Sequence, residues 1–547
     1  MRDRVEVKGW SRSSSACLVR RVSLTQTLSC EREGTEQFHP HSGGAQNLEE
    51  FRFVIRKALL GVLGLIAALI LIVAAKTLFT TSKQLNVPAE QSVTVDSAAA
   101  SARLAAAVKL QTISSATDAE ASADAFKALH QHMQTSFPKM HAALTRELIG
   151  SYGLLYTWRG TDAKTKPIAL LAHQDVVPVA PGTERDWQQP PFGGVIDGGF
   201  VWGRGAWDNK SNLFSQLEAV EMLVASGFQP KQTVYMFFGQ DEEVSGHRGA
   251  QVLAKRFRAE NIKVDFILDE GTLIVEGILK GLDKPAALVG IAEKGYLTVM
   301  LQATATPGHS SMPPPTARES AIGMMSAALS RLEDKQFPVQ IRGIAADMFN
   351  TLAPEMNFTH RVILSNLWLT KPLVESQLAK GTSTAALLRT TTALTVMNAG
   401  DRDNVLPGRA DAQVNFRVLP GDTSDGVIKH TMLAVGDAPI KADKKAGFSE
   451  PSKVARTDAP GYQAIAKTIR QLQPGVVVAP ALMLGATDAR HFDDVADNVY
   501  RFSPVRAGPN DLVRFHGTNE RVSVANYTEM IQFYYQLLRN VNAATTP

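Results

Sequence analysis

From residue 58 to residue 75 the chain is apolar without interruption. Arg52, Arg56 and Lys57 precede this run, and Lys76 follows it. In a helix, which rises about 1.5 Å per residue, the run covers about 27 Å, close to the roughly 30 Å thickness of a membrane's hydrocarbon core. The pattern therefore predicts a transmembrane anchor. The basic flank predicts that the N-terminus stays in the cytoplasm and that the rest of the chain is exported.

A cleaved signal peptide is the alternative, although its apolar region usually spans only about 7–15 residues. Ala74 and Ala75 are the small residues that cleavage favours. We therefore expect an exported protein that is membrane-anchored, with its body on the extracytoplasmic side, or secreted if the signal is cleaved. Residues 1–57 are expected to be a disordered extension. Because the pattern from Val54 on resembles a complete export signal, a further hypothesis is that the native protein lacks residues 1–53.

Beyond a polar linker at 76–97, short apolar runs alternate with helical patterns. Strands are predicted at 154–158, 168–172 and 233–238, and a helix with an apolar stripe at 211–226. This alternation predicts an α/β fold with a mainly parallel sheet and helices on both faces. We assign residues 98–294 to the first part of this catalytic domain.

The pattern changes near residue 295. Alternating apolar and polar residues at 296–305, 393–397 and 412–418 predict strands with one solvated face, and helices are predicted at 320–332 and 425–435. These elements indicate an inserted α+β domain at 295–450. Residues 451–547, with helices at 461–472 and 524–540, then complete the catalytic domain.

The composition narrows the chemistry. The net charge of +4 is small for 547 residues, and no basic stripe is interleaved with aromatic residues, so nucleic acid is not an expected partner. The two cysteines, Cys17 and Cys30, lie near the N-terminus. The body therefore has no cysteine nucleophile or thiolate ligand, and any metal must be held by His, Asp and Glu.

Three adjacent acids, Asp241, Glu242 and Glu243, follow the apolar run at 233–238. Ligands bind beyond the carboxyl ends of strands in open α/β sheets. Three carboxylates at such an end repel one another unless a proton or a positive group is present. A divalent metal is the simplest candidate, although a solvated acidic loop has the same pattern.

Other acids and histidines follow predicted strands or turns in the same way. They are His173 with Asp175, Asp208 in a glycine-rich turn before a helix, Asp269 after a short strand, and His516 near the C-terminus. Each has a plainer explanation alone, such as a surface histidine or a helix N-cap. Together with Glu243 they form a nitrogen and oxygen ligand set suited to zinc. If Asp208 bridges, each of two ions has one His, one carboxylate of its own and the shared one.

Five motifs occur in a fixed order: H-x-D-x-V-P, G-R-G-x-x-D-x-K, D-E-E-x-x-G, D-E-G and H-G-x-N-E. In this order they resemble the dinuclear-zinc peptidase and amidohydrolase family of carboxypeptidase S, aminoacylase-1 and glutamate carboxypeptidase. The resemblance covers about residues 101–538. Within the family, the subgroup of carboxypeptidase S and the secreted N-fatty-acyl-amino-acid synthase/hydrolase is most similar. That likeness rests on Asn366-Leu-Trp368 and on the runs at 389–394 and 485–490.

The resemblance implies two Zn²⁺ per subunit, with Co²⁺ or Mn²⁺ as possible substitutes. His173 and Asp269 would bind one ion, Glu243 and His516 the other, and Asp208 both. Asp175 would orient His173, and Glu242 would be the general base that passes a proton from water to the leaving amine. A cis peptide bond is implied between Asp208 and Asn209.

The resemblance also assigns roles in the inserted domain, which in this family is a lid that often dimerises. His309 would bind substrate and stabilise the tetrahedral oxyanion, often across the dimer interface of a homodimer. Asn404 and Arg417 match substrate-binding positions, and the guanidinium fork of Arg417 suits a free carboxylate.

The sequence therefore predicts a zinc-dependent amidohydrolase or metallocarboxypeptidase that releases a C-terminal amino acid from short peptides. The alternative is hydrolysis of an N-acyl, including a fatty-acyl, amino acid, which uses the same chemistry. An inactive binding module agrees less well with the sequence, because all five ligand positions and the base are present.

Overall fold

A computed structural model describes residues 43–436 and 439–542. Its first helix, α1 (Gly43–Phe79), contains the predicted apolar run. The stretch Phe51–Phe79 is long and apolar enough to cross a membrane, a test that a signal sequence also passes. Residues 43–57 of the expected disordered extension form the first turns of this helix, in a segment without proline. The rest of that extension lies outside the described residues.

The described chain divides into two units between Leu69 and Ile70. In the second unit, residues 80–96 join α1 to the body without a helix or strand. This second unit contains all of the predicted site residues.

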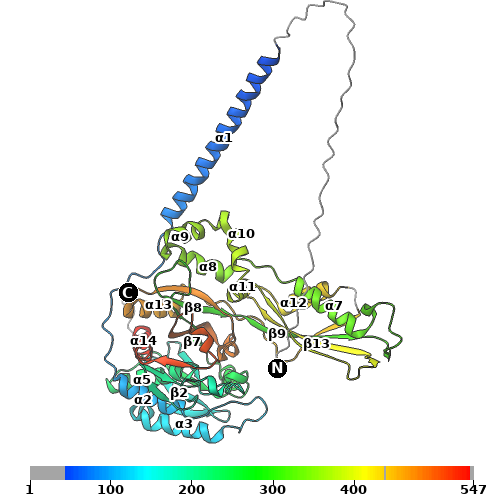
Figure 1. Ribbon diagram of the computed structural model, residues 1–547. Coiled ribbons are helices and arrows are strands. Elements are labelled where there is room, and N and C mark those ends of the chain that lie inside the picture. Colours follow the sequence, from blue (N-terminus) through cyan, green and yellow to red (C-terminus); the bar gives the residue numbers. More distant parts are fainter. Residues whose placement is uncertain (1–42, 437–438, 543–547) are drawn as a thin grey trace, which may run out of the picture. The chain divides into compact units, whose positions relative to one another are not determined.

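The body is built on an eight-stranded sheet in the order β1-β2-β6-β3-β7-β16-β8-β15 (Figure 1). The strands are β1 (Thr145–Ile149), β2 (Gly153–Trp158), β3 (Ile168–His173), β6 (Val234–Gly239), β7 (Val264–Val275), β8 (Ala286–Glu293), β15 (Val477–Met483) and β16 (Ala496–Ala507). The central pairs β6–β3, β3–β7 and β7–β16 are parallel, as is β8–β15, whereas β1 and β2 run antiparallel at one edge. The predicted mainly parallel α/β sheet is confirmed.

Helices cover both faces of this sheet. Even-numbered β3 residues such as Leu170 face one core, and the odd-numbered Leu171 faces another, as the period of a strand requires. The first face packs against α2 (Ser97–Val108), α3 (Ala123–Ser136), α4 (Pro138–Ala143), α5 (Lys210–Ala225), α13 (Pro460–Leu472) and α14 (Val524–Asn542). The second face packs against α6 (Ala250–Ala259).

The inserted region has two parts with different cores. Its four-stranded antiparallel sheet has the order β11-β13-β9-β14. The strands are β9 (Gly295–Thr304), β11 (Thr391–Ala399), β13 (Arg409–Val418) and β14 (Ile440–Lys444). Two helices, α7 (Ala321–Asp334) and α12 (Ser424–Val435), pack on this sheet and form a separate core, which we call the lid.

The second part of the inserted region lies on the catalytic sheet. Four helices follow one another in it: α8 (Gly343–Leu352), α9 (Phe358–Ser365), α10 (Leu367–Leu378) and α11 (Thr382–Leu388). Side chains from this segment share a core with Val477 and Ala479 of β15 and Ala286 of β8. The sequence predicts one inserted domain at 295–450, whereas its middle segment packs on the second face of the catalytic sheet.

Smaller elements complete the fold. Two small sheets pair β17 (Arg521–Ser523) with β5 (Phe200–Trp202) and β4 (Val195–Asp197), and β10 (Gly308–His309) with β12 (Val405–Leu406). Short 3₁₀-helices lie at η1 (Glu184–Asp186), η2 (Glu242–Val244), η3 (Ala317–Glu319), η4 (Ala353–Glu355), η5 (Asp488–Phe492) and η6 (Leu512–Arg514).

Candidate active site

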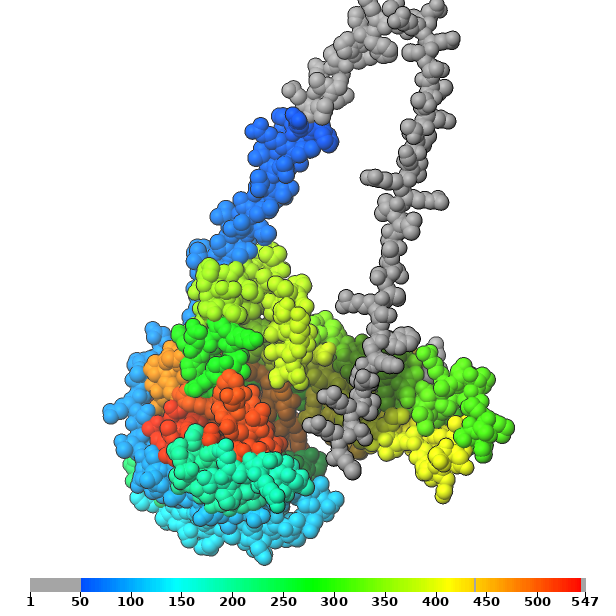
Figure 2. Space-filling model, in the orientation of Figure 1, coloured from blue at the N-terminus to red at the C-terminus, as the bar shows by residue number. Residues whose placement is uncertain are grey.

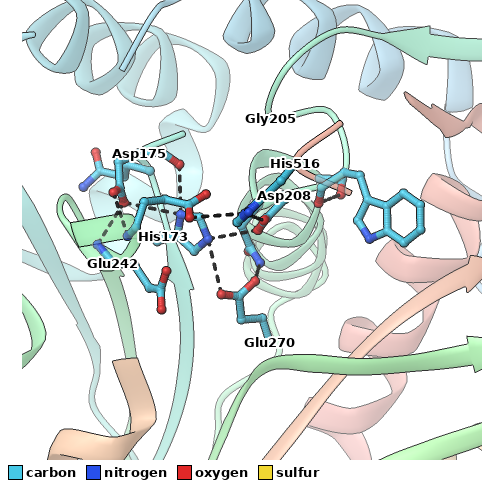
Figure 3. A network of polar contacts seen from close by, with 12 residues as sticks. His173, Asp175, Gly205, Asp208, Glu242, Glu270 and His516 are labelled. Carbon is cyan, nitrogen blue, oxygen red and sulfur yellow. Dashed lines mark hydrogen bonds and ion pairs between the residues drawn. The ribbon is translucent and has the colours of Figure 1, made fainter. Parts of the chain in front are cut away.

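Asp208 lies between two imidazoles at the carboxyl edge of the sheet (Figure 3). Its Oδ1 is 3.1 Å from Nε2 of His173, which ends β3, and its Oδ2 is 2.8 Å from Nε2 of His516. Asp208 ends the turn that leads into α5, and the peptide bond to Asn209 is cis, as the resemblance implies. One carboxylate thus contacts two histidines that are far apart in the chain.

The acidic loop after β6 lies on one side of this trio. Glu243 Oε2 is 3.2 Å from His516 Nε2, and the other oxygen of Glu243 is buried without a hydrogen-bond partner in the described structure. Glu242 lies with His173 and Glu270 in a second group, whose possible ligand atoms are all within 4.8 Å of one another. The two adjacent glutamates therefore face different parts of the cluster.

Asp175 holds this arrangement in place. Its main-chain oxygen is 2.9 Å from His173 Nδ1, and its carboxylate Oδ1 is 3.3 Å from the same nitrogen. The two carboxylate oxygens also accept hydrogen bonds from the main-chain N–H groups of Glu242 (3.2 Å) and Glu243 (3.1 Å). Asp175 thus fixes both the ring and the acidic loop.

Glu270, rather than the expected Asp269, reaches the cluster. Glu270 Oε1 is 3.3 Å from His173 Nε2. The oxygens of Asp269 instead accept hydrogen bonds from the main-chain N–H groups of Glu270 and Ala489, each at 2.8 Å. Successive side chains of β7 point to opposite sides, so only one of the two neighbouring acids can face the histidine. The geometry therefore places Glu270, and not Asp269, beside His173, and the choice of metal ligand between the two acids stays a prediction.

Glu520 holds the turn that carries Asp208, a role that the sequence analysis did not predict. Its Oε1 accepts hydrogen bonds from the main-chain N–H groups of Gly205 (2.9 Å), Trp207 (2.9 Å) and Asp208 (3.0 Å). Its other oxygen pairs with the buried Arg204. The signal was present in the sequence, since Glu520 is the last residue of the H-G-x-N-E motif.

Burial and close charges shift the protonation of these groups. Burial raises the pKa of Glu242 well above its usual value and that of Glu270 to about 8. Hydrogen bonds to Asp208 and Glu243 raise the pKa of His516 to about 10. Although burial opposes ionisation of Asp208, hydrogen bonds from the two imidazoles hold its pKa below the usual range. Without a metal, protons are therefore held on Glu242, Glu270 and His516, close to where a cation would bind.

The cluster fits a divalent metal centre. His173, Asp208 and Glu243 form one group that could hold an ion, and His173, Glu242 and Glu270 form another. The donors are imidazole nitrogens and carboxylate oxygens, which suit zinc. The unpaired buried oxygen of Glu243 and the surplus of acids over histidines both require a positive partner.

The cluster opens into a cleft of about 1030 Å³ between the catalytic sheet and the lid. Arg417 of β13 lines this cleft, and its guanidinium lies 4.8 Å from the centre of the Tyr296 ring. The lid loop 445–449 lines the same cleft. Apolar side chains form much of the remaining wall: Leu273, Val275, Leu288, Leu482 and Leu484.

His309 and Asn404 lie together on the lid, outside the lining of this cleft. Ser310 donates its main-chain N–H to the main-chain oxygen of Asn404 at 3.0 Å, next to the β10–β12 pair. His309 is exposed, and its Nδ1 is 2.8 Å from Ser311 Oγ. The described chain therefore brings Arg417 to the cleft but leaves the other two lid residues at the surface.

The fold and the cluster define a metal-dependent hydrolase of the α/β type. Residues 169–540 match Peptidase family M20/M25/M40, and the chain belongs to this family. Its enzymes are typically dinuclear zinc enzymes. The chain is thus a hydrolase with peptidase or amidohydrolase activity.

Two relatives cover most of the chain. "Probable carboxypeptidase S-like 2" of Dictyostelium discoideum is 38% identical over 499 residues, which are 89% of this chain and 94% of the relative. The "N-fatty-acyl-amino acid synthase/hydrolase PM20D1" of Mus musculus is 38% identical over 450 residues, which are 81% of this chain and 88% of the relative. The predicted subgroup is confirmed.

Solved structures show the same fold. The M20 family metallo-carboxypeptidase Sso-CP2 from Sulfolobus solfataricus matches with a TM-score of 0.57 at 19% identity, covering 82% of this chain and 99% of its own. Human carnosine dipeptidase 1 matches with a TM-score of 0.57 at 15% identity, covering 82% of this chain and 96% of its own.

Proposed function

We propose that the chain is a dinuclear zinc amidohydrolase that releases an amino acid with a free carboxylate. The observation that carries this proposal is the position of Asp208 between His173 and His516. A further acid, Glu270 or Glu243, adjoins each histidine. His173 and Glu270 would hold one ion, His516 and Glu243 the other, and Asp208 both.

Zinc bound there supplies Lewis acidity, which acidifies water and polarises an amide carbonyl. Glu242 is then the general base. Its main-chain N–H is fixed by Asp175, and its carboxylate lies with His173 and Glu270 in the cluster, within reach of a water held there. The proton that Glu242 takes from water passes to the nitrogen of the leaving amine, so the amino group leaves neutral.

Arg417 supports recognition of the amino-acid end. It lines the cleft, and burial lowers the pKa of its guanidinium, a cost that a bound carboxylate would offset. Tyr296 packs against the guanidinium and holds its plane. This pairing favours substrates with a free carboxylate next to the scissile amide.

The apolar wall of the cleft favours N-acyl amino acids as a second substrate class. Leucine and valine side chains from β7, β8 and the end of β15 line the cleft. Such a surface gains free energy by burying an acyl chain, at about 25 cal/mol per Å². The mouse relative also has N-fatty-acyl-amino acid synthase/hydrolase in its name.

His309 and Asn404 would take part through the lid of a partner subunit. Both are outside the cleft in the single chain, and His309 is exposed. We propose a homodimer in which the His309 imidazole of one subunit stabilises the oxyanion in the other, with Asn404 beside it.

We also propose that α1 anchors the enzyme on the extracytoplasmic side of a membrane. The apolar helix is compatible with a signal anchor, and basic residues lie on its N-terminal side. Cleavage after Ala75 would instead release a soluble enzyme. N-terminal sequencing of the native protein distinguishes the two, since a start after Ala75 would contradict the anchor.

The substrate test uses the zinc-loaded full chain and two substrate series that end in the same amino acid. One series carries a blocked aminoacyl group and the other a long-chain acyl group, and each is supplied as a free acid and as a carboxamide. We expect hydrolysis of the free acids and a large loss for the carboxamides. The Arg417→Met variant should lose this preference, whereas the exposed-site control Arg318→Met should keep it. Absence of zinc-dependent hydrolysis in both series would favour the inactive binding module.

A further inference from the structure

The Asn366-Leu-Trp368 sequence lies at the corner between α9 and α10, far from the active-site cluster in the chain. Asn366 is fully buried. Its amide nitrogen donates hydrogen bonds to the main-chain oxygen of Val362 (2.8 Å), to Thr77 Oγ1 (3.0 Å) and to the main-chain oxygen of Val73 (3.3 Å). Val73 and Thr77 belong to the last turns of α1. This asparagine therefore fastens the end of the apolar helix to the α9–α10 corner.

Two further contacts strengthen the same joint. The guanidinium of Arg361 in α9 donates to the main-chain oxygens of Thr77 (3.2 Å) and Thr80 (2.9 Å), which the end of α1 leaves unpaired. Trp368 Nε1 donates to Asn366 Oδ1 at 3.1 Å, so the indole has a fixed position. The joint is thus built from directed hydrogen bonds.

The outer face of α9–α10 carries large apolar side chains that nothing in the described chain covers. Phe358 is 74% exposed, Leu373 59%, Trp368 51% and Leu369 46%. Leu78 and Phe79, at the end of α1, are 72% and 82% exposed. We call these six residues the corner patch. Figure 2 shows α9–α10 in yellow-green beside the C-terminal end of α1.

The side chains of the corner patch are not needed for the hydrophobic core of the body. The opposite sides of the two helices already fill one, since Leu364, Leu367 and Val374 pack against the catalytic sheet. From Phe358 to Val374 the sequence contains no Asp or Glu. Both helices therefore have apolar faces on two sides, and no acid would have to be desolvated if the outer face met an apolar phase.

We propose that the corner patch docks the catalytic body onto the surface of the lipid bilayer that α1 enters. This rests on the proposed anchoring by α1. The apolar run ends at Lys76, so the patch is fastened to the helix at the level where the hydrocarbon ends and the headgroups begin. Trp368 has an apolar ring and a hydrogen-bonded N–H, the side chain typical of that interface.

The docking differs from simple tethering. A flexible tether between the membrane helix and the body would let the body rotate freely. The patch and the joint together would hold one face of the second unit against the headgroups, with Phe358, Trp368, Leu369 and Leu373 in the interfacial layer.

The test uses the full chain with Cys17 and Cys30 replaced by Ser, because these are its only cysteines. A single cysteine is then introduced at Leu373, at Leu433 or at Leu65 and labelled with an environment-sensitive fluorophore. Leu433 lies on the lid helix α12 and is 69% exposed, so it matches Leu373 without belonging to the patch. Leu65 reports on the anchor itself. Each variant is reconstituted in phosphatidylcholine vesicles with or without lipids that carry a quencher near the headgroup or at the chain end.

We expect the label at Leu373→Cys to be quenched severalfold more by the headgroup quencher than the label at Leu433→Cys, and the label at Leu65→Cys to be quenched best by the chain-end quencher. Quenching at Leu65 without extra quenching at Leu373 would overturn the docking and leave the anchor intact. Equal quenching at Leu373 and Leu433 would overturn it as well. Blue-shifted but unquenched emission at Leu373 would mean that a second protein copy covers the patch. If Leu65 itself is unquenched, the anchor fails and docking with it.

Discussion

At the scale of single residues, neighbouring acids in this site have separate partners. Glu242 lies in the group with His173 and Glu270, whereas Glu243 contacts His516. Replacing Glu242 with Gln keeps the shape of the side chain but removes the proton acceptor. We expect kcat to fall by about 10²–10⁴, with zinc content unchanged by elemental analysis. The matched variant Glu243→Gln should lower the zinc content instead. A Glu242→Gln enzyme with near-normal turnover would contradict the assignment of the base.

The choice of metal ligand between Glu270 and Asp269 on β7 is tested by a second matched pair. Glu270→Ala should lower the bound zinc below two ions per chain, because Glu270 is the acid beside His173. Asp269→Ala should keep the zinc but lower the melting temperature. It leaves two buried N–H groups without acceptors, at a cost of about 1–3 kcal/mol each. Zinc analysis and thermal unfolding of both variants separate these outcomes; loss of zinc from Asp269→Ala with retention in Glu270→Ala would restore the original assignment.

This pair also shows what the sequence could and could not specify. The D-E-G motif identified the strand that borders the cluster, although β7 runs on to Val275 and does not end before Asp269. Five of the six clustered acids and histidines were predicted: His173, Asp208, Glu242, Glu243 and His516. To choose between Asp269 and Glu270, one must know which residues of β7 face the cluster. Side chains alternate along a strand, so two adjacent acids do not show which of them faces inwards. Glu520 ends the H-G-x-N-E motif, but the motif does not show that its carboxylate accepts hydrogen bonds from three main-chain N–H groups, so its role was missed.

At the scale of elements, Lys294 is the one residue between β8 and β9, where the chain passes from the catalytic sheet to the lid. Its ammonium group donates to the main-chain oxygens of Ala386 and Arg389, each at 2.9 Å. Burial, together with the charge of Arg417, lowers its pKa to about 7. The junction is thus fastened by a lysine that loses its charge far more readily than a free one.

This lysine gives a pH dependence with a definite sign. In the unfolded chain a lysine keeps its proton up to roughly pH 10.4. Between about pH 7 and that value the unfolded state binds more protons, so stability from this residue rises with pH. Lys294→Met should therefore lose stability relative to the native chain as the pH rises from 7 to 9. Apparent melting temperatures across that range, with the exposed Lys445→Met as control, measure the difference; a constant difference would contradict the lowered pKa.

The element pattern explains why the inserted region was only partly predicted. The strands and helices of the lid alternate clearly, and β9, β11, β13 and α12 lie close to their predicted positions. The helices from α8 to α11 are short, and α9 and α10 carry apolar residues on more than one side, so periodicity does not show which domain they cover. Their attachment to the catalytic sheet depends on contacts with β15, a strand that begins 89 residues after Leu388 ends α11.

At the scale of the whole molecule, the role of His309 distinguishes an enzyme that works as a monomer from one that works as a dimer. Its side chain is exposed and lies outside the lining of the cleft. If a partner subunit supplies it, His309→Ala and Glu242→Ala should each be inactive alone, whereas a mixture refolded or coexpressed together should recover up to about one quarter of the native activity. Activity of the mixture no higher than that of the two variants alone would show that His309 does not act between subunits.

The site also gathers its parts from nearly the whole length of the body, from His173 to Glu520. The turn that carries Asp208 has its main-chain N–H groups bound by Glu520, and the second imidazole comes from His516. A ribosome must therefore translate more than three hundred residues after Asp208 before its supports exist. During synthesis the growing chain carries the acidic loop without its final partners. The enzyme is consequently inactive until its C-terminal segment has been synthesised. A premature stop before His516 yields a protein with most of the strands of the fold but an incomplete active site.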